Sequence, residues 1–147
     1  MTFQNFIDWA KHEFNYPIPR GYLDFLEKGE FDSTERKYYV TAEECVLEIS
    51  EWLTPDNLPV VYKNCREEGM IEEYHLPVLE SCGCIAVLNC NPEMDAYGQI
   101  FLSTPTGYYD ESIDKNVYEE PQFIAKNFSA VICNLKYAEE LEEMGLF

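Results

Sequence analysis

The stretch LPVLESCGCIAVLN, residues 76–89, decides the fold. Its first part, Leu76–Leu79, leads into Gly83, and the run Ile85–Leu88 follows. Both faces of the second run are apolar, which is typical of an inner strand that is covered on both sides. We therefore predict two strands joined by a turn at Gly83, with the second strand inside an antiparallel sheet.

Further strands are predicted on either side of this stretch, because short apolar or aromatic runs alternate there with turn residues. The predicted strands are Lys37–Val40, Gln99–Ser103 and Ser112–Tyr118, and the predicted turns are Asn91–Asp95 and Thr104–Gly107.

Helical spacing dominates the first half of the chain. Phe3–Phe14 carries apolar residues on one face, as an amphipathic helix does, and Pro19–Gly29 has a start and a stop signal for a second helix. The segment Thr41–Glu44 resembles a capping box, so Cys45–Leu53 is predicted as a third helix. A fourth helix is predicted at Leu58–Glu68.

A closing helix is predicted from Pro121, with an apolar stripe of Ile124, Phe128, Val131 and Leu135. Residues 136–147 form an acidic C-terminal extension that we expect to add more helix. The predicted fold is α+β. Along the chain, helices come first, a mainly antiparallel sheet of about five or six strands follows, and a helix closes the domain. At this length, residues 1–147 are expected to form a single domain.

Charge limits the possible partners. The chain has 28 acidic and 10 basic residues, a net charge of −18, yet 46% of its residues are hydrophobic and 15% aromatic. Such a chain can build a core, so the charge should lie outside, where it repels nucleic acid and anionic membranes and attracts basic proteins. The N-terminus lacks the features of a signal peptide, since Asp8 and Lys11 interrupt its apolar run. A cytoplasmic protein without membrane or nucleic-acid contacts is expected.

The cysteines are expected to be reduced, buried and structural. Cys45 and Cys133 fall on predicted helical stripes, and Cys90 ends an apolar run. The spacing of Cys82, Cys84 and Cys90 does not match a zinc site built from Cys-x-x-Cys pairs. The remaining cysteine is Cys65.

Catalytic signatures are absent from the sequence. There is no phosphate-binding glycine loop, no Gly-x-Ser-x-Gly turn and no His-Glu-x-x-His motif. His12 is expected to be solvated, whereas a pairing of His75 with Cys82 or Cys84 is the one thiolate–imidazolium couple to consider. Adjacent glutamates on a helix surface do not supply the raised pKa that hydrolases need. We expect no enzymatic activity, no cofactor and no metal.

Acidic residues are concentrated where basic ones are missing. Residues 67–114 contain no lysine or arginine. The predicted partner-binding face combines acidic side chains, which steer a basic partner, with tyrosines, which give contact area. Its members are Glu67, Glu68, Glu72, Glu73, Glu93, Asp95, Tyr97, Tyr108, Tyr109, Asp110, Glu111 and Asp114. Glu80 and Tyr74 lie in the same stretch. The alternative is that the tyrosines pack against the sheet and the acids only keep the protein soluble.

Three segments together resemble the SUKH superfamily, which groups Smi/Knr-type regulators of fungal cell-wall synthesis with bacterial immunity proteins that neutralise polymorphic toxins. They are Ile18–Phe31, Leu76–Asn89 with the following Gly98–Phe101, and Phe123–Leu135. Positions that keep the family's residue type include Pro19, Tyr22, Phe25, Leu26, Gly29, Gly83, Gly98, Ile124, Ala125, Phe128 and Leu135. The resemblance covers about residues 1–136 and consists mostly of core and turn positions.

The resemblance implies an α+β fold and a protein that acts by binding, without catalysis. The first hypothesis is an immunity-type protein that neutralises a basic, nuclease-like toxin by stoichiometric binding. The second is a regulatory scaffold of the cell-wall synthesis type that recruits a partner enzyme. A third is a cysteine- or zinc-dependent enzyme that uses His75, Cys82, Cys84 and Cys90.

Overall fold

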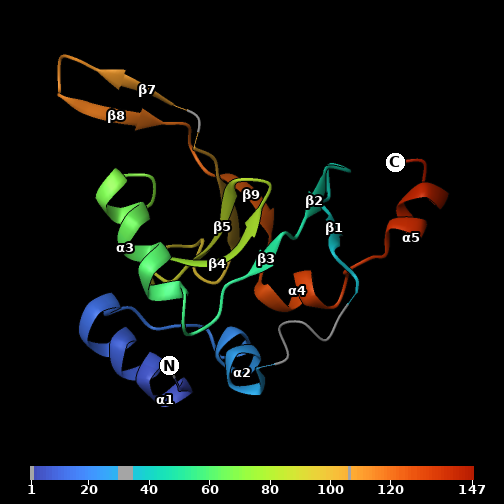
Figure 1. Ribbon diagram of the computed structural model, residues 1–147, viewed down its shortest axis with the longest axis horizontal. Helices are drawn as coiled ribbons and strands as arrows, with labels where there is room; N and C mark the ends of the chain where they lie inside the picture. The colour runs from blue at the N-terminus through green and yellow to red at the C-terminus, as the bar shows by residue number, and fades with distance from the viewer. Residues whose placement is uncertain (1, 30–34, 106) are drawn as a thin grey trace.

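The computed structural model describes residues 2–29, 35–105 and 107–147 and shows the predicted α+β fold (Figure 1). The helices are α1 (Phe3–Trp9), the π-helix η1 (Ala10–Phe14), α2 (Arg20–Lys28), α3 (Leu58–Glu68), α4 (Phe128–Ile132) and α5 (Ala138–Glu143). The strands are β1 (Tyr38–Val40), β2 (Val46–Glu48), β3 (Glu51–Trp52), β4 (His75–Ser81), β5 (Cys84–Asn89), β6 (Ile100–Ser103), β7 (Gly107–Asp110), β8 (Lys115–Tyr118) and β9 (Gln122–Ala125).

The main sheet has five antiparallel strands in the order β3-β4-β5-β6-β9. Strand β5, the predicted inner strand, lies at the centre of the sheet and pairs with β4 on one side and with β6 on the other. A two-residue turn joins β4 to β5, with φ of 48° at Cys82 and 86° at Gly83. Two consecutive positive φ angles are typical of the type I′ turn, whose twist matches that of the strands it joins.

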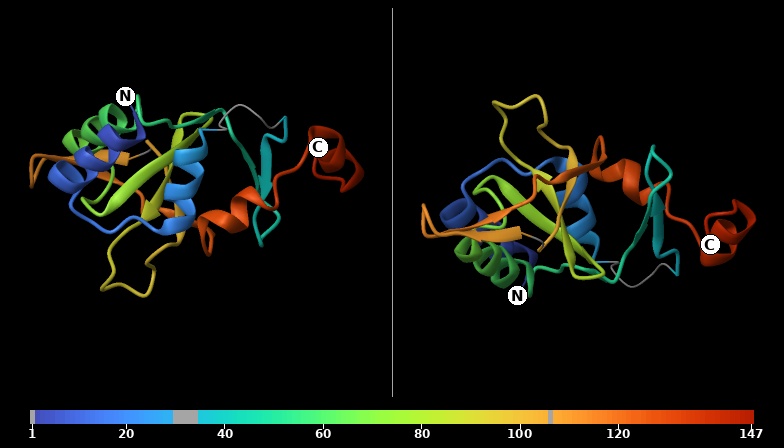
Figure 2. Two further views of the ribbon diagram at one scale, coloured as in Figure 1. Left: turned by 90° about the horizontal axis from the view of Figure 1, so that it is seen from below. Right: turned by 90° about the horizontal axis from the view of Figure 1, so that it is seen from above.

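One face of this sheet, the inner face, forms the core with α1, α2 and α4. Figure 2 shows α2 lying across it. Leu76, Leu88 and Ile100 sit on this face and are almost fully buried. Phe6, Phe14, Tyr22, Leu26, Phe128 and Val131 pack from the helices onto the same cluster.

Two β-bulges increase the apolar area on the inner face. Pro77 pairs with Val87 but Leu79 pairs with Ala86, so Val78 is an extra residue in β4. In β9, Ile124 is the extra residue between the two that pair with β6. A bulge locally breaks the strict alternation of side chains between the faces. As a result, consecutive residues in each strand, Val78 with Leu79 and Ile124 with Ala125, are buried in the same core cluster.

Two smaller sheets lie outside the main one. The β7–β8 hairpin projects away from it, and β1–β2 stands at the opposite end beside α5 (Figure 1). Lys136 bridges to Tyr38 of β1 and so connects the C-terminal extension to this second sheet. The predicted extra helix in the extension is present as α5.

The helix predicted for Cys45–Leu53 is wrong, and β2 and β3 occupy this segment. Thr41 accepts the N–H of Cys45 through its hydroxyl, as a cap would, but Glu44 takes a φ of 61° and reverses the chain. The segment then pairs with β1 and β4. Leu47, Ile49 and Trp52 are buried, so the apolar spacing that fitted a helix also serves two short strands separated by a bend.

The closing helix does not start at Pro121. Residues Gln122–Ala125 pair with β6 as the edge strand β9, and helix α4 begins only at Phe128. Asn127 is the N-cap, and its side-chain oxygen accepts the N–H of Ala130 at 2.7 Å. The pairing with β6 satisfies backbone groups that a longer helix would have bonded internally.

The other predicted elements are confirmed with shifted ends, and Gly29 and Gly69 take the left-handed conformation expected after α2 and α3. Strand β7 was not predicted. Thr106, in the predicted turn Thr104–Gly107, lies outside the described residues, as do residues 30–34 at the end of the segment Ile18–Phe31. Among the described residues, no helix combines the length and the hydrophobicity needed to cross a bilayer.

We predict that Leu88→Ala lowers the free energy of unfolding by about 2–5 kcal/mol, because Leu88 is fully buried in the central strand and truncation leaves a cavity. Urea denaturation measures the change. Val60→Ala is the control, since Val60 is 59% exposed on α3 and its truncation should change stability by no more than about 0.5 kcal/mol. Equal losses in both variants would contradict the assignment of Leu88 to the core.

Candidate partner-binding surface

The end of α3 and the turn after it carry the first group of predicted acids, here called the α3 end: Glu67, Glu68, Glu72 and Glu73. All four side chains are exposed. Arg66 lies among them, but its Nη1 donates to the carbonyl of Ile71 at 2.7 Å and holds the turn. The α3 end therefore presents exposed carboxylates on a turn that a hydrogen bond and the helix keep in place.

Two tyrosines hold Glu73. Tyr16 donates its hydroxyl to Oε1 of Glu73, and Tyr62 donates to the Glu73 carbonyl oxygen, both at 2.8 Å. The hydrogen bond to the carboxylate, with partial burial, raises the pKa of Tyr16. The ring of Tyr16 also contacts Tyr74 at 6.2 Å. Sequence reasoning missed Tyr16 and Tyr62, because no local pattern relates Tyr16 to a residue 57 positions away.

The loop between β5 and β6, residues 90–99, carries Glu93, Asp95 and Tyr97, all exposed. Tyr97 donates its hydroxyl to the carbonyl of Pro17 at 3.0 Å, next to the Tyr16 that binds Glu73. The structure thus brings Glu73, Tyr74 and Tyr97 together around Tyr16 and Pro17.

The β7–β8 hairpin carries the remaining predicted residues. Tyr108 and Tyr109 are 64% and 54% exposed. Tyr109 donates its hydroxyl to the carboxylate of Asp114. Ser112 donates both its hydroxyl and its N–H to Asp110, and these bonds hold the pKa of Asp110 below its ordinary value. The carboxylate of Asp110 is therefore maintained as an anion at the hairpin turn, next to the exposed Glu111.

The predicted residues form three groups rather than one continuous patch. The base of the hairpin reaches the α3 end, since Tyr118 packs on the cluster of Cys65, Met70 and Ile71. The hairpin and the loop 90–99 leave the sheet in different directions (Figure 2). Tyr108 and Tyr109 of the hairpin and Tyr97 of the loop are exposed, so these three do not pack against the back of the sheet.

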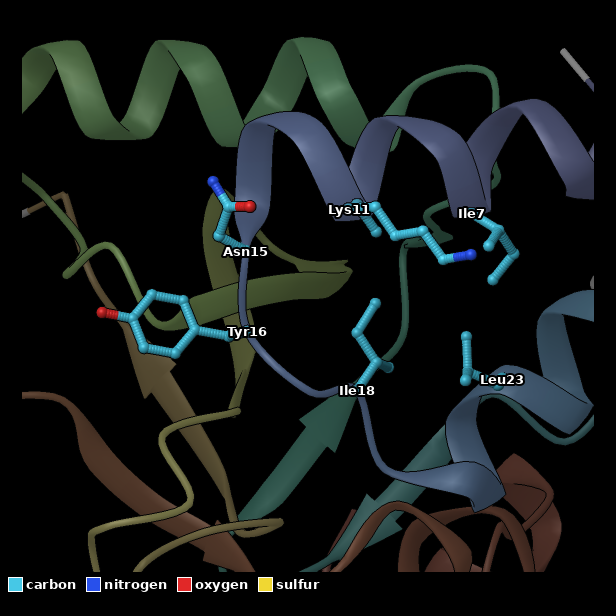
Figure 3. Close-up of a pocket in the computed structure, with 7 residues that line it drawn as sticks. Ile7, Lys11, Asn15, Tyr16, Ile18 and Leu23 are labelled. Carbon is cyan, nitrogen blue, oxygen red and sulfur yellow. The ribbon is translucent and has the colours of Figure 1, made fainter.

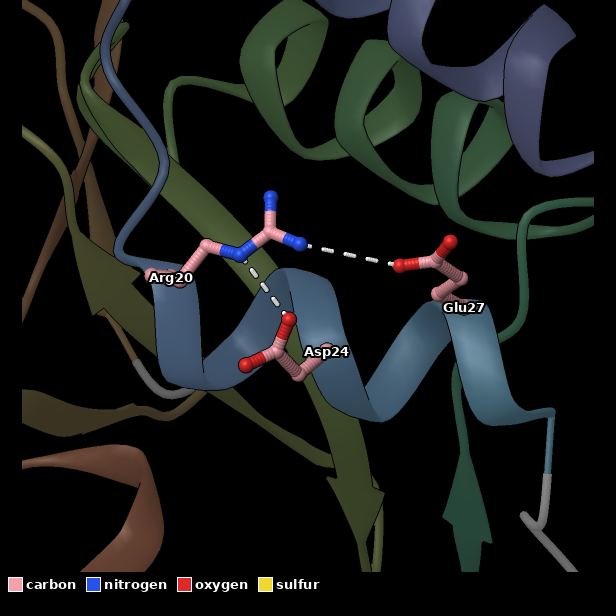
Figure 4. Close-up of polar contacts among 3 residues, drawn as sticks. All are labelled: Arg20, Asp24 and Glu27. Atoms are coloured by element: carbon pink, nitrogen blue, oxygen red, sulfur yellow. Dashed lines mark ion pairs between the residues drawn. The ribbon is translucent and has the colours of Figure 1, made fainter.

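Several cations are engaged within the chain, one of them beside Glu67 of the α3 end. Arg20 of α2 pairs with Asp24 at 2.9 Å and with Glu27 at 3.7 Å (Figure 4). Lys63 lies 4.0 Å from Glu67, and Arg36 stacks over the ring of Tyr137. These exposed contacts contribute little to stability. They hold the side chains of Arg20, Lys63 and Arg36 next to nearby residues, and none of these contacts lies on the hairpin or the loop 90–99.

His75 is buried and neutral. Its Nδ1 accepts the N–H of Glu72 at 3.0 Å, which leaves the ring proton on Nε2. Burial, with a smaller contribution from Arg66, lowers the pKa of His75 to about 4. The imidazole is therefore uncharged at neutral pH and has a structural hydrogen bond to the backbone of the α3 end.

The proposed thiol couples do not assemble. His75 begins β4, whereas Cys82 and Cys84 follow its other end, roughly 20 Å away at about 3.3 Å per strand residue. Cys90 is near His75 in the sheet but is buried in the core, and burial strongly raises the pKa of its thiol. In the described part of the chain, no group of three His, Cys, Asp or Glu side chains has a metal-binding arrangement.

The prediction that the cysteines are buried is only partly confirmed. All six are free thiols; Cys65 and Cys90 are buried, Cys84 is half-buried, and Cys45, Cys82 and Cys133 are exposed. Cys45 lies in the β1–β2 turn and Cys133 just after α4, because the two helices on whose stripes they were placed are absent or shorter.

A cavity of about 390 Å³ lies between α1, η1 and α2. Figure 3 shows Ile7 facing Ile18 and Leu23, with Lys11 at the side. None of the described residues that line it is acidic, so this cavity does not hold the pair of carboxylates that glycoside hydrolysis uses.

Comparison with known proteins finds no family model and no curated protein that matches this chain.

We predict that protonation of His75 makes stability fall in mild acid. The folded pKa of about 4 lies below the unfolded value near 6.5, so the unfolded state binds more protons between these values. The contribution of neutral His75 is complete above about pH 6.5 and is lost as the pH falls towards 4. At pH 5 the loss is about 2 kcal/mol.

The measurement is urea unfolding of wild type and His75→Gln at pH 7.5 and pH 5. The stability difference between the two proteins should shrink in acid, whereas the exposed His12→Gln control should follow wild type. A ring of His75 that titrates near pH 6.5 in NMR spectra would contradict the burial argument.

Proposed function

We propose that this protein is a non-enzymatic, cytoplasmic binding protein of the immunity type, which neutralises a basic, nuclease-like toxin by stoichiometric association. The observation that carries the proposal is the exposure of carboxylates and tyrosines at the α3 end, the loop 90–99 and the hairpin. The resemblance of three segments to the SUKH superfamily supports it, because proteins of that superfamily act by binding.

The electrostatics favour a basic partner. The net charge is −18, and residues 67–114 add acids without any lysine or arginine. A surface of one sign steers an oppositely charged protein and raises association rates by about 10 to 10³, an effect that fades with salt. A nuclease carries basic side chains where it binds phosphates, so an acidic protein that covers this region also blocks the substrate.

Partner capture tests the proposal directly. Affinity purification from the native host, with the neighbouring reading frames identified, should recover a basic toxin encoded beside this gene. The purified protein should abolish the toxin's activity at a one-to-one ratio. Recovery of a cell-wall synthesis enzyme, with no toxin gene nearby, would support the regulatory scaffold instead.

We predict that charge reversal at four exposed positions, Glu68, Glu72, Asp95 and Glu111→Lys, slows association with the partner at least about tenfold at low salt. Among the described residues, these side chains make no hydrogen bond that the change would break. Stopped-flow or surface-binding kinetics at low and high ionic strength measure the effect, which should shrink as salt screens the charges.

The matched control reverses four exposed acids elsewhere, Glu43, Glu139, Glu142 and Glu143→Lys, and gives the same net charge. An equal slowing in both variants would show that total charge, and not these three groups, directs the partner.

A further inference from the structure

The strand registers place two rows of side chains on the second face of the main sheet, here called the outer face. The first row runs Glu51, Glu80, Ile85 and Ser103, which are successive cross-strand partners from β3 to β6. The second row runs Pro77, Val87, Phe101 and Phe123, from β4 to β9. The outer face therefore has a charged end at β3 and an aromatic end at β9.

The charged end holds two like charges side by side. Glu51 and Glu80 are direct partners in neighbouring strands, and like charges at such positions are destabilising. The amide of Asn57 donates to Oε1 of Glu51 at 3.1 Å, but it brings no positive charge. A cation bound between the two carboxylates would remove the repulsion.

The aromatic end is partly open to solvent. Phe123 is 49% exposed, and its ring meets that of Phe101 edge to face at 5.9 Å. Ile85 and Phe101 are half-buried beside it. An edge-to-face pair is a rigid apolar contact surface that needs little ordering when a partner packs on it.

The outer face is less covered than the inner one. Its cluster is covered by Val61, Tyr62 and Cys65 of α3, by Met70 and Ile71 of the turn after α3 and by Tyr118 of β8, and this cover leaves Ile85 and Phe101 half-buried. The right panel of Figure 2 looks onto this side, with α2 behind the sheet. Two exposed acids, Glu119 and Glu120, lie next to the aromatic end, between β8 and β9.

We propose that the outer face binds a basic, partly apolar protein segment. A lysine or arginine of the segment lies between Glu51 and Glu80, and apolar side chains pack on Ile85, Phe101 and Phe123. Strands are about 4.8 Å apart and the two rows lie about 6.6 Å apart along the strands, so the carboxylates and Phe123 are separated by roughly 16–20 Å. An extended segment covers that distance in about five to six residues.

Charge complementarity favours this occupant over a second copy of the chain. Two outer faces in contact would bring Glu51, Glu80, Glu119 and Glu120 towards the same acids of the other copy. Nucleic acid and anionic lipid are repelled for the same reason. The inference rests on the proposed function in one respect, the basic character of the partner, but it uses side chains outside the three acidic groups.

Synthetic peptides of about ten residues test the proposal without the natural partner. In the probe peptide, every second side chain faces the sheet. The facing side chains are two lysines at one end and a leucine and a phenylalanine at the other. One control peptide has glutamate in place of lysine, and the other has serine in place of the apolar residues. Amide chemical shifts of ¹⁵N-labelled protein report where each peptide binds.

We expect the lysine probe to shift amides of β4, β5, β6 and β9, and both control peptides to bind at least about tenfold more weakly. Phe123→Ser and Glu80→Gln should each weaken the probe by about tenfold. Val60→Ser, which alters a side chain 59% exposed on α3, should not. Circular dichroism and the melting temperature establish that each variant is folded.

Three results would overturn the proposal. The first is that the lysine probe binds only at the α3 end and the hairpin, with an affinity that Phe123→Ser does not change. This result would leave the proposed partner-binding function of the acidic groups intact. The second is no binding of the lysine probe at all. The third is a dimer in sedimentation experiments that Phe123→Ser dissociates, since the occupant is then a second copy. The proposed function fails by a different result, namely that the native partner is not a basic protein.

Discussion

Burial of the inner face of the five-stranded sheet is the constraint on which the rest of the structure depends. The Cys82–Gly83 turn sets the register of β4 and β5, and that register determines which side chains meet the helices. The bulges at Val78 and Ile124 then add apolar contacts without lengthening the strands. Because removal of apolar area from water drives folding, a chain of net charge −18 can fold with its carboxylates outside.

The same arrangement positions the candidate binding surfaces. The segment after α3 is held by the Arg66 hydrogen bond and by His75, which begins β4 and accepts the amide of Glu72. Tyr16 then ties the N-terminal helices to Glu73. The acids of the α3 end are therefore fixed by the core elements, whereas those of the hairpin depend on its own turn, where Ser112 bonds to Asp110. Under the proposed function, a partner would contact one group of acids that is fixed by the core and one that projects on the hairpin.

Local signals in the sequence predicted much of the fold, and they failed where two elements share one pattern. Gly83 and Gly69 mark a turn and a helix end that the structure confirms. Residues 45–53 satisfy helical spacing, yet pairing with β1 and β4 decides their conformation. The predicted acids and tyrosines are exposed except for the half-buried Asp110, but the pair Glu51 and Glu80 depends on the register of β3, which no local pattern contains.

The edges of the sheet have a consequence for the behaviour of the protein in a crowded cell. A half-covered sheet with an exposed phenylalanine is at risk of strand-to-strand polymerisation. Here one edge is β3, only two residues long and carrying Glu51, and the other is β9, which a bulge distorts beside Phe123. Short, charged or bulged edges make poor templates for another strand. The edges of the sheet therefore disfavour pairing with strands of other chains, although apolar side chains such as Phe123 remain exposed on its outer face.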